Sequence, residues 1–329
     1  MIDLSCAFAT SMETPAHIAE AERLGYKRAW VYDSPALYPD VWMTLALAAE
    51  RTTTIGLGPA VLIPSLRHPM ANAAAIATLE ALAPGRVAVA VGAGFTGRYT
   101  LGERPLRWSL VEEYVVALRQ LLRGETAEWE GAPIRMLHPD GFGARRPIQV
   151  PLLIGADGPK GTAVAERVSD GVFAAGVPNP AVAGGRHVLL QFGTALADGE
   201  DVRSQRVLDA AGPALAVLFH ALYERGGAAA VGRLPGGEEW VAALAALPKR
   251  DRHLVTHDGH LVSVTGLDEK AVTQAADLLP TVTLSGTPEQ LRAKVATIET
   301  AGVTEIAYQP AGPDIAGELQ RMKAALSDG

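Results

Sequence analysis

A glycine-rich turn follows the apolar run that ends at Ile154, and its residue types suit the binding of an anion. It consists of Gly155, Ala156, Asp157, Gly158, Pro159 and Lys160. The turn opens a predicted helix, so backbone N–H groups and the helix dipole would face an anion, and Lys160 would add a charge. A segment after the next predicted strand is expected beside it: Ala175, Gly176 and Val177. We predict a phosphate site here, the alternative being a plain strand-to-helix connection.

The stretch from Thr54 to Pro69 joins a strand pattern to an abrupt end at Pro64. Its apolar residues alternate with Gly56, Gly58 and Ala60, which is typical of a strand that buries one face tightly and lets other backbone come close. The small residues leave one face with little side chain, which suits a flat ligand lying against the backbone. The alternative is a core strand that ends in a proline-terminated loop.

Asp33 and a cluster of histidines are the titratable residues that we consider as candidates for proton transfer or metal binding. Asp33 follows the second predicted strand and could exchange a proton or act only as a structural hydrogen-bond acceptor. His253, His257 and His260 fall within eight residues and suggest zinc, but the loop has no flanking cysteine or glutamate pattern. We therefore predict no metal site.

The elements that position these residues alternate between strand and helix patterns. Strands are predicted at residues 2–9, 28–32, 54–63, 87–91, 148–154, 172–175, 187–195 and 303–309. Segments of helical periodicity separate most of them, which requires a parallel sheet, and eight strands in 329 residues favour a closed (β/α)8 barrel over an open sheet. Catalytic groups in such a barrel lie at the carboxyl ends of the strands.

Three regions depart from regular alternation. Residues 124–147 contain several Gly and Pro residues and are interpreted as an excursion, and residues 201–225 as a long helix with a bend at Gly212-Pro213. Residues 226–280, rich in Ala, Gly and His, are predicted to be an insertion late in a single domain that spans residues 1–329. The chain has no GxGxxG turn after the first strand and no GxxxxGK[ST] motif, which disfavours Rossmann and P-loop nucleotide sites.

The amino-acid composition of the chain limits the classes of partner that it is expected to bind. Hydrophobic residues make up 48% of the chain and the net charge is -7, so no basic excess suggests nucleic acid or an anionic membrane surface, and we expect a small-molecule substrate. The single cysteine, Cys6, lies in an apolar strand and is expected to be buried. With no internal disulfide and no basic segment at the N-terminus, we expect a cytoplasmic protein.

Aromatic residues form only 5% of the chain, yet several gather in the first half near the predicted mouth of the barrel. Most are expected to pack in the core or at the rim. Phe8, Phe95 and Tyr99 are the candidates for an apolar substrate pocket.

Several of these segments together resemble the bacterial luciferase-like superfamily. They are Asp33, GLGPAVLIPSLRHP, VAVGAGF, LLRGETAEWEG, PLLIGADGPKGTAVAERVSDGVF and LSGTPEQLRAKVATIETAGV, in the order of the chain. The resemblance covers residues 1–176 and 281–310. It implies a (β/α)8 barrel that holds FMN or the deazaflavin coenzyme F420, and oligomers are usual in the superfamily, so a homodimer is expected.

The resemblance also assigns roles to residues. In the deazaflavin branch a cis peptide bond bulges from strand three behind the ring, and the matching bond joins Ala60 and Val61. Gly155 to Lys160, with Ala175 to Val177, would hold the cofactor phosphate. Three residues after the fourth strand would pass close to the ring: Gly92, Ala93 and Gly94.

The chain departs from the sugar-phosphate dehydrogenases of that branch where proton transfer is concerned. Those enzymes have an Asp-His pair after strand two and a glutamate after strand four, whereas Ser34 follows Asp33 here and Phe95 replaces the glutamate. Reduction of a carbonyl or imine still needs a proton donor. Asp33 is one catalytic candidate. His260 is the other and His257 a substrate-contacting candidate, because a similar histidine segment occurs in some deazaflavin-type relatives, although a purely structural loop explains that segment most simply.

These observations favour an oxidoreductase that transfers a hydride between coenzyme F420 and a small organic substrate. One alternative is an FMN-dependent monooxygenase that uses reduced flavin and O2. Another is a barrel that binds the cofactor without catalysis. A cofactor-free sugar-phosphate isomerase or lyase is disfavoured, since no lysine or paired carboxylate ends a central strand.

Overall fold

Eight strands form one sheet in the computed structural model, which describes residues 2–327. The order is β3-β2-β1-β10-β9-β8-β7-β4. Single parallel bridges, Leu57 to Val87 and Leu62 to Val91, then link β3 to β4 and nearly close the barrel. The strands are β1 (Asp3–Phe8), β2 (Arg28–Val31), β3 (Gly56–Pro59), β4 (Val89–Gly92), β7 (Leu152–Gly155), β8 (Gly171–Ala174), β9 (Arg186–Phe192) and β10 (Glu305–Gln309). All eight predicted strands are confirmed, and so is the (β/α)8 fold.

The chain divides into two compact units. The first comprises residues up to Gly97, Arg104–Leu190 and Ile298–Ala307. The second comprises Arg98–Glu103, Gln191–Thr297 and the residues from Tyr308 onward. Each unit is described by itself below.

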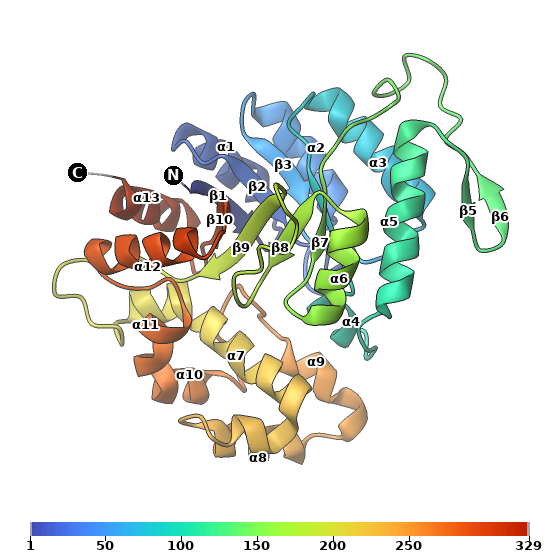
Figure 1. Cartoon of the computed structure of the whole chain (residues 1–329). Helices are drawn as coiled ribbons and strands as arrows, with labels where there is room; N and C mark the ends of the chain where they lie inside the picture. Colours follow the sequence, from blue (N-terminus) through green and yellow to red (C-terminus); the bar gives the residue numbers. More distant parts are fainter. Residues whose placement is uncertain (1, 328–329) are drawn as a thin grey trace. The chain divides into compact units, whose positions relative to one another are not determined.

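The first unit contains most of the barrel strands and their covering helices, coloured blue to green in Figure 1. Strand β4, with the sequence VAVG, is fully buried, as expected when both faces of a parallel strand are covered, and β2 is fully buried although it begins with Arg28. The helices are α1 (Thr14–Arg23), α2 (Val41–Arg51), α3 (Pro69–Leu82), α5 (Trp108–Arg123) and α6 (Pro159–Val168), with α4 (Thr96–Tyr99) at the boundary between the units. Within the predicted excursion, β5 (Ala127–Trp129) and β6 (Ala132–Ile134) form an antiparallel hairpin rather than a simple turn.

A buried carboxylate ties three strands of this unit together. Glu305 on β10 is 1% exposed and accepts hydrogen bonds from Trp30 Nε1 on β2 (2.8 Å) and from Arg186 Nη1 on β9 (2.6 Å). A charge at such depth is tolerated because both of its oxygens are paired. Cys6 is buried, as predicted.

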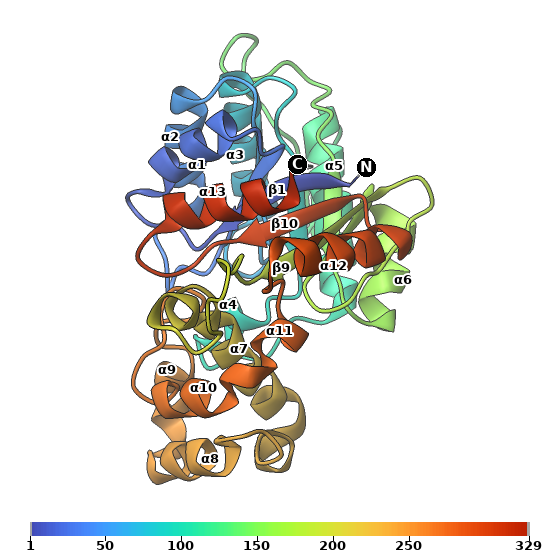
Figure 2. The ribbon, with the colours of Figure 1, turned by 90° about the vertical axis from the view of Figure 1, so that its left-hand side faces the viewer.

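The second unit is largely helical. Its helices are α7 (Gln205–Val231), α8 (Gly237–Ala246), α9 (Arg252–Thr256), α10 (Glu269–Ala275), α11 (Leu279–Val282), α12 (Pro288–Thr300, ending in the first unit) and α13 (Ile315–Leu326), with 3-10 turns η1 (Lys249–Asp251) and η2 (Ala276–Leu278). Figure 2 shows α7 to α10 gathered as one group, coloured yellow to orange. The segment predicted to be an insertion is thus mostly helix.

Helix α7 forms the core of that group. Phe219, Leu215 and Val207 pack with Trp240 of α8 and Val272 of α10. By length and composition α7 could cross a membrane, but half of its most apolar window is buried within the structure, as in the core helix of a globular unit. Helix α7 continues through Pro213, where a bend was predicted, and its backbone leaves helical geometry at Gly227.

Candidate functional site

The carboxyl ends of β3 and β4 meet around an unusual peptide bond. The bond between Ala60 and Val61 is cis, as the resemblance implied. It follows β3 directly, where the Ala60 N–H donates to the Val31 carbonyl (2.8 Å). One residue later the Leu62 N–H donates to the Ala90 carbonyl of β4 (2.8 Å). The chain therefore changes hydrogen-bonding neighbour across the cis bond, which fixes Val61 at the strand ends.

The Val61 side chain lies against two glycines at the ends of other strands. A Cβ at Gly92 would lie 2.9 Å from Val61 Cγ2, and one at Gly155 would lie 2.5 Å from Cγ1. Both distances are too short for carbon atoms, so only glycine at these positions admits the valine. Val61 itself is half-buried. The ends of β3, β4 and β7 thus present backbone and one valine, with no other side chain on Gly92 or Gly155.

Two glycines earlier in β3 have a different role. A Cβ at Gly58 would lie 2.0 Å from the Ala88 carbonyl oxygen, and one at Gly56 would lie 2.6 Å from the Arg28 guanidinium carbon. These positions admit a neighbouring backbone and a buried arginine, and both are buried. The close approach of other backbone inferred from the sequence is therefore present, and these two glycines do not leave an open face for a ligand.

Asp33, at the end of β2, is held by an ion pair. Arg67 Nη1 donates to Asp33 Oδ2 and Arg67 Nη2 donates to Asp40 Oδ2, each at 2.6 Å. Asp40 also caps α2 by accepting from the Trp42 and Met43 amides. Burial raises the pKa of Asp33, and the adjacent Arg67 opposes that rise. Asp33 is thus an oriented carboxylate with limited exposure.

Ser34 and Phe95 replace the residues found in the sugar-phosphate dehydrogenases. A Cβ at Gly97 would lie 2.5 Å from Ile63 Cδ1 and 3.2 Å from Ser34 Oγ, so the chain after β4 packs closely on the end of β2. Phe95 is half-buried. Phe8 is 3% exposed and stacks on His17 with ring centres 6.4 Å apart. Phe8 therefore lies in the packed interior of the first unit.

The predicted anion turn begins α6 in the expected way. Gly158 is the N-cap and has no capping side chain, and a Cβ there would meet nothing within 4 Å. Gly161, one turn into the helix, packs on Trp108, whose ring carbons would lie 2.6 Å from a Cβ. Lys160 is exposed. The start of α6 is thus open to solvent and anchored from behind by a tryptophan.

One carboxylate within the turn changes the expected geometry. Asp157 Oδ1 accepts from the amides of Ala175 (2.7 Å) and Gly176 (3.1 Å). These amides were expected to face a phosphate. In the structure the Asp157 carboxylate takes their hydrogen bonds, so any anion at this turn would rely on the α6 amides and Lys160. Val177 is 60% exposed.

The candidate histidines lie in the second unit. His257 and His260 are 1% and 5% exposed, and His220 of α7 lies between them and Asp268. Tyr99, also in this unit, stacks on His257 with ring centres 6.4 Å apart. Burial lowers the pKa of His257 to about 3 and the pKa of His260 well below its usual value, with neighbouring histidines adding to both shifts. Both rings are therefore neutral at neutral pH.

A family model described as luciferase-like monooxygenase matches residues 9–305. This chain belongs to the luciferase-like family. Among curated relatives, a 5,10-methylenetetrahydromethanopterin reductase of Archaeoglobus fulgidus is 31% identical over 168 residues, which is 49% of this chain and 48% of that protein. An F420-dependent glucose-6-phosphate dehydrogenase of Beutenbergia cavernae is 36% identical over 179 residues, 47% of this chain and 50% of that protein. These alignments thus span about half the length of the luciferase-like relatives.

Solved structures extend the similarity over the whole fold. The F420-dependent tetrahydromethanopterin reductase of Methanopyrus kandleri matches with a TM-score of 0.68 at 18% identity and covers 99% of this chain and 98% of its own. An F420-dependent secondary alcohol dehydrogenase matches with a TM-score of 0.65 at 17% identity, covering 99% of each chain. At these sequence identities, the two matches support the luciferase-like barrel fold and nothing more specific.

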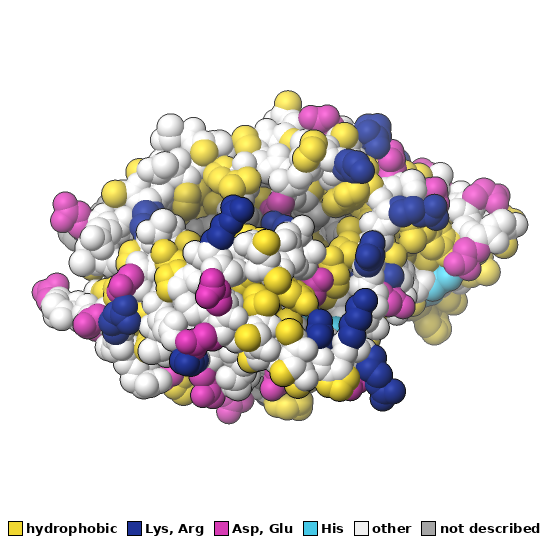
Figure 3. Space-filling model, turned by 90° about the horizontal axis from the view of Figure 1, so that it is seen from below, with side chains coloured by type: hydrophobic (Ala, Val, Ile, Leu, Met, Phe, Trp, Pro, Cys, Tyr) yellow, Lys and Arg dark blue, Asp and Glu magenta, His cyan; other side chains and the backbone are white. Residues whose placement is uncertain are grey.

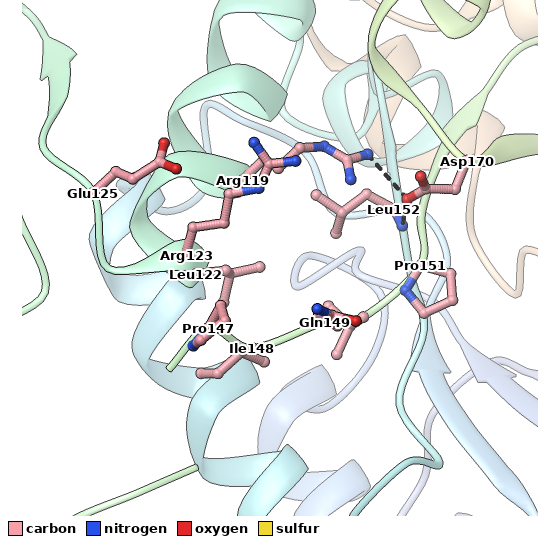
Figure 4. A pocket seen from close by; sticks show the side chains of 11 residues that line it. Arg119, Leu122, Arg123, Glu125, Pro147, Ile148, Gln149, Pro151, Leu152 and Asp170 are labelled. Atoms are coloured by element: carbon pink, nitrogen blue, oxygen red, sulfur yellow. Dashed lines mark hydrogen bonds and ion pairs between the residues drawn. The ribbon is translucent and has the colours of Figure 1, made fainter. Parts of the chain in front are cut away.

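A hollow of about 660 Å³ lies at the other end of β7. Its lining includes Leu152, Pro151, Gln149 and Arg123, and Arg119 pairs there with Asp170 (Figure 4). Leu152 is the first residue of β7 and Gly155 the last, so the hollow lies at the amino end of the strand. Active sites in (β/α)8 barrels lie at the carboxyl ends. This hollow is therefore separate from the candidate site of this luciferase-like protein.

Three features of the site were missed from the sequence. Arg67 joins Asp33 to Asp40, and no local pattern indicates a link between residues so far apart in the chain. His220 of α7 lies beside His257 and His260, which come much later in the chain. Asp157 was grouped with its glycine neighbours although its side chain caps two amides. A polar residue inside an apolar helix was the signal available for His220.

Proposed function

We propose that this protein is an F420-dependent oxidoreductase that transfers a hydride between the deazaflavin and a small organic substrate. The observation that carries the proposal is the cis Ala60–Val61 bond with Val61 seated on Gly92 and Gly155. That arrangement presents backbone and the single Val61 side chain at three neighbouring strand ends, which suits the flat face of a tricyclic ring. The Beutenbergia relative is named as an F420-dependent glucose-6-phosphate dehydrogenase, which supports the same choice of cofactor.

The residues present fit such a cofactor in two places. The ring would lie by Ala60 and Val61, with Gly92, Ala93 and Gly94 beside it. Its anionic tail would meet the start of α6, where Gly158 leaves open space and Lys160 is exposed. The dipole of α6 favours negative charge there. When bound, F420 supplies a carbon that accepts or donates a hydride.

Asp33 is the group we propose for proton exchange with the substrate. A general acid works best when its pKa is near the working pH, and burial moves the pKa of Asp33 in that direction. Arg67 limits this rise and fixes the direction of the carboxylate. The buried His257 and His260 are given no step in this reaction.

Titration with coenzyme F420 and, separately, with FMN tests the proposal. We expect F420 fluorescence to change on binding, with F420 bound more tightly than FMN, and reduced F420 to be oxidised by members of a carbonyl and imine substrate panel. Tighter FMN binding together with O2 uptake by the reduced-FMN complex would overturn the proposal in favour of a monooxygenase. F420 binding with no turnover on any substrate would favour the non-catalytic alternative.

The monooxygenase remains the second candidate because FMN enzymes share this fold. The oxygenating component of a 3,6-diketocamphane monooxygenase, solved with FMN, matches with a TM-score of 0.60 at 13% identity. Both cofactors carry a flat ring and an anionic tail, so the same backbone surface suits either. The paired titrations separate them.

A further inference from the structure

The helical second unit contains a polar cluster that the proposed hydride transfer does not use. His220 projects from α7, while His257 and His260 come from the segment that follows α9. Their ring centres lie 5.3 to 5.7 Å apart in all three pairs. One nitrogen from each ring can be chosen so that all three lie within 4.8 Å of one another. Three imidazoles therefore lie close together inside the unit.

A turn in the backbone brings His257 and His260 close together. The His260 N–H donates to the His257 carbonyl (3.2 Å), forming a tight turn. Gly259 has a positive φ of 67°, and the following Leu261 has a φ of 60°, which is unusual for a residue with a side chain. The Leu261 carbonyl accepts from Gln309 Nε2 at 2.7 Å. The turn is thus held in its conformation by a buried side chain.

The hydrogen bonding of the cluster leaves ligand atoms available. Across residues 2–327, neither ring nitrogen of His257 nor Nδ1 of His220 has a hydrogen-bond partner, although all three atoms are buried. Buried polar atoms are nearly always paired, so unpaired ones call for an explanation. His220 Nε2 lies 3.0 and 3.1 Å from the two Asp268 oxygens, and Trp240 Nε1 donates to the same carboxylate at 2.7 Å.

We propose that His220, His257 and His260 bind a zinc ion, with the Asp268 carboxylate orienting His220 from the outer sphere. A carboxylate that accepts from the far nitrogen of a ligating histidine is a regular feature of zinc sites, because it fixes the tautomer and ring direction. Here it leaves His220 Nδ1 for the metal. Neutral imidazole nitrogen is a ligand that zinc prefers, and all three rings are buried.

The geometry requires only a small contraction. Zinc-nitrogen bonds of about 2.0 to 2.1 Å in a tetrahedral site place the nitrogens about 3.3 Å apart. The donor atoms, now within 4.8 Å, would approach one another by about 1.5 Å or less, which rotation of the rings can supply. The fourth position falls to water or another small ligand. Such an ion would tie α7 to residues 257–268 and stabilise this unit.

Metal analysis of the full-length protein, purified without a histidine tag, tests the proposal. We expect about one tightly held zinc per chain after dialysis, and a four-coordinate cobalt spectrum after exchange with Co²⁺. His257→Asn should remove both signals. His253→Asn is the matched control, because His253 lies on the same segment but outside the cluster and should retain both.

Asp268→Asn provides a second test that keeps the three ligands. We expect zinc affinity, measured by competition with a chromophoric chelator, to fall about 10- to 100-fold. Circular dichroism confirms that each variant is folded. Absence of zinc binding by the wild type, or equal binding by the His257→Asn and His253→Asn variants, would overturn the proposal. F420 titration is a separate measurement, so its result does not decide this one.

Discussion

Replacement of Gly155 by alanine tests the surface that carries the proposed function. The new Cβ would lie 2.5 Å from Val61 Cγ1, against an ordinary contact distance of 3.4–4 Å. Val61 must then move by about 1 Å, and the cis bond on which it sits must follow or the strand ends must separate. Gly158→Ala is the matched control, because a Cβ there meets nothing within 4 Å and the backbone, with φ −130° and ψ 166°, suits any residue.

The expected loss of stability is the difference in the free energy of unfolding between Gly155→Ala and Gly158→Ala. Overpacking of a well-packed site destabilises by about 1–3 kcal/mol. Either alanine also reduces the entropy of the unfolded chain, which stabilises by about 0.4–1 kcal/mol, and this contribution is shared by both variants. We therefore expect Gly155→Ala to lower the free energy of unfolding by about 1–3 kcal/mol relative to Gly158→Ala. F420 affinity should fall about tenfold in Gly155→Ala, since the displaced valine enters the ring surface.

Urea unfolding and F420 fluorescence titration measure these effects, and a double mutant identifies their cause. In Val61→Ala/Gly155→Ala the clashing methyl is gone, so the cost of the second substitution should be smaller than in the wild-type background. Equal stability of Gly155→Ala and Gly158→Ala would refute the contact. Unchanged F420 affinity in a Gly155→Ala protein that is clearly destabilised would refute the placement of the ring.

Three further substitutions probe charges. Arg67→Met leaves the buried Asp33 carboxylate without its ion pair and should lower the free energy of unfolding by about 3 kcal/mol or more at neutral pH. Because burial raises the pKa of Asp33, the contribution of Asp33 to stability is most favourable below its unfolded pKa and is lost as pH rises through the folded pKa. Urea unfolding should therefore show a smaller loss of stability in acid, and an equal loss at both pH values would contradict this reasoning. Lys160→Ala should weaken F420 binding about two- to fivefold and reduce its salt dependence in titrations at low and high salt. Glu305→Gln keeps an acceptor for Trp30 but removes the charge that pairs with Arg186, so we expect a loss of about 1.5–3 kcal/mol in urea unfolding, and no loss would show that this buried charge is dispensable.

The barrel could be predicted from the sequence because parallel strands buried on both faces are continuous apolar runs. The segments VAVG and LLIG are such runs, and their separation by helical patterns predicted a parallel sheet. The strand ends were predicted less accurately. Strand three was predicted over residues 54–63, but β3 ends at Pro59, because the chain then changes its hydrogen-bonding neighbour from β2 to β4. A local pattern does not encode where a ladder stops.

The side-chain arrangement of the sites was harder to predict because it joins residues far apart in the chain. Gly92 was singled out for contact with a ring and Gly155 for contact with a phosphate, whereas in the structure both make room for Val61. The histidine segment was predicted not to bind a metal because it has no flanking cysteine or glutamate pattern. The zinc proposal rests instead on the proximity of His220 of α7 to this segment, which depends on how α7 packs against residues far along the chain.

The charge pattern also bears on what the protein binds. On the face shown in Figure 3, basic, acidic and apolar side chains are interspersed, which gives no extended field of one sign. Long-range attraction therefore contributes little on that face, and recognition of an anionic cofactor has to come from short-range groups. Lys160 and the start of α6 are groups of that kind, while Asp157 lowers the positive potential beside them by taking the amides of Ala175 and Gly176. Affinity for the cofactor should therefore depend more on the fit of its ring to the backbone at Ala60 and Val61 than on its charged tail.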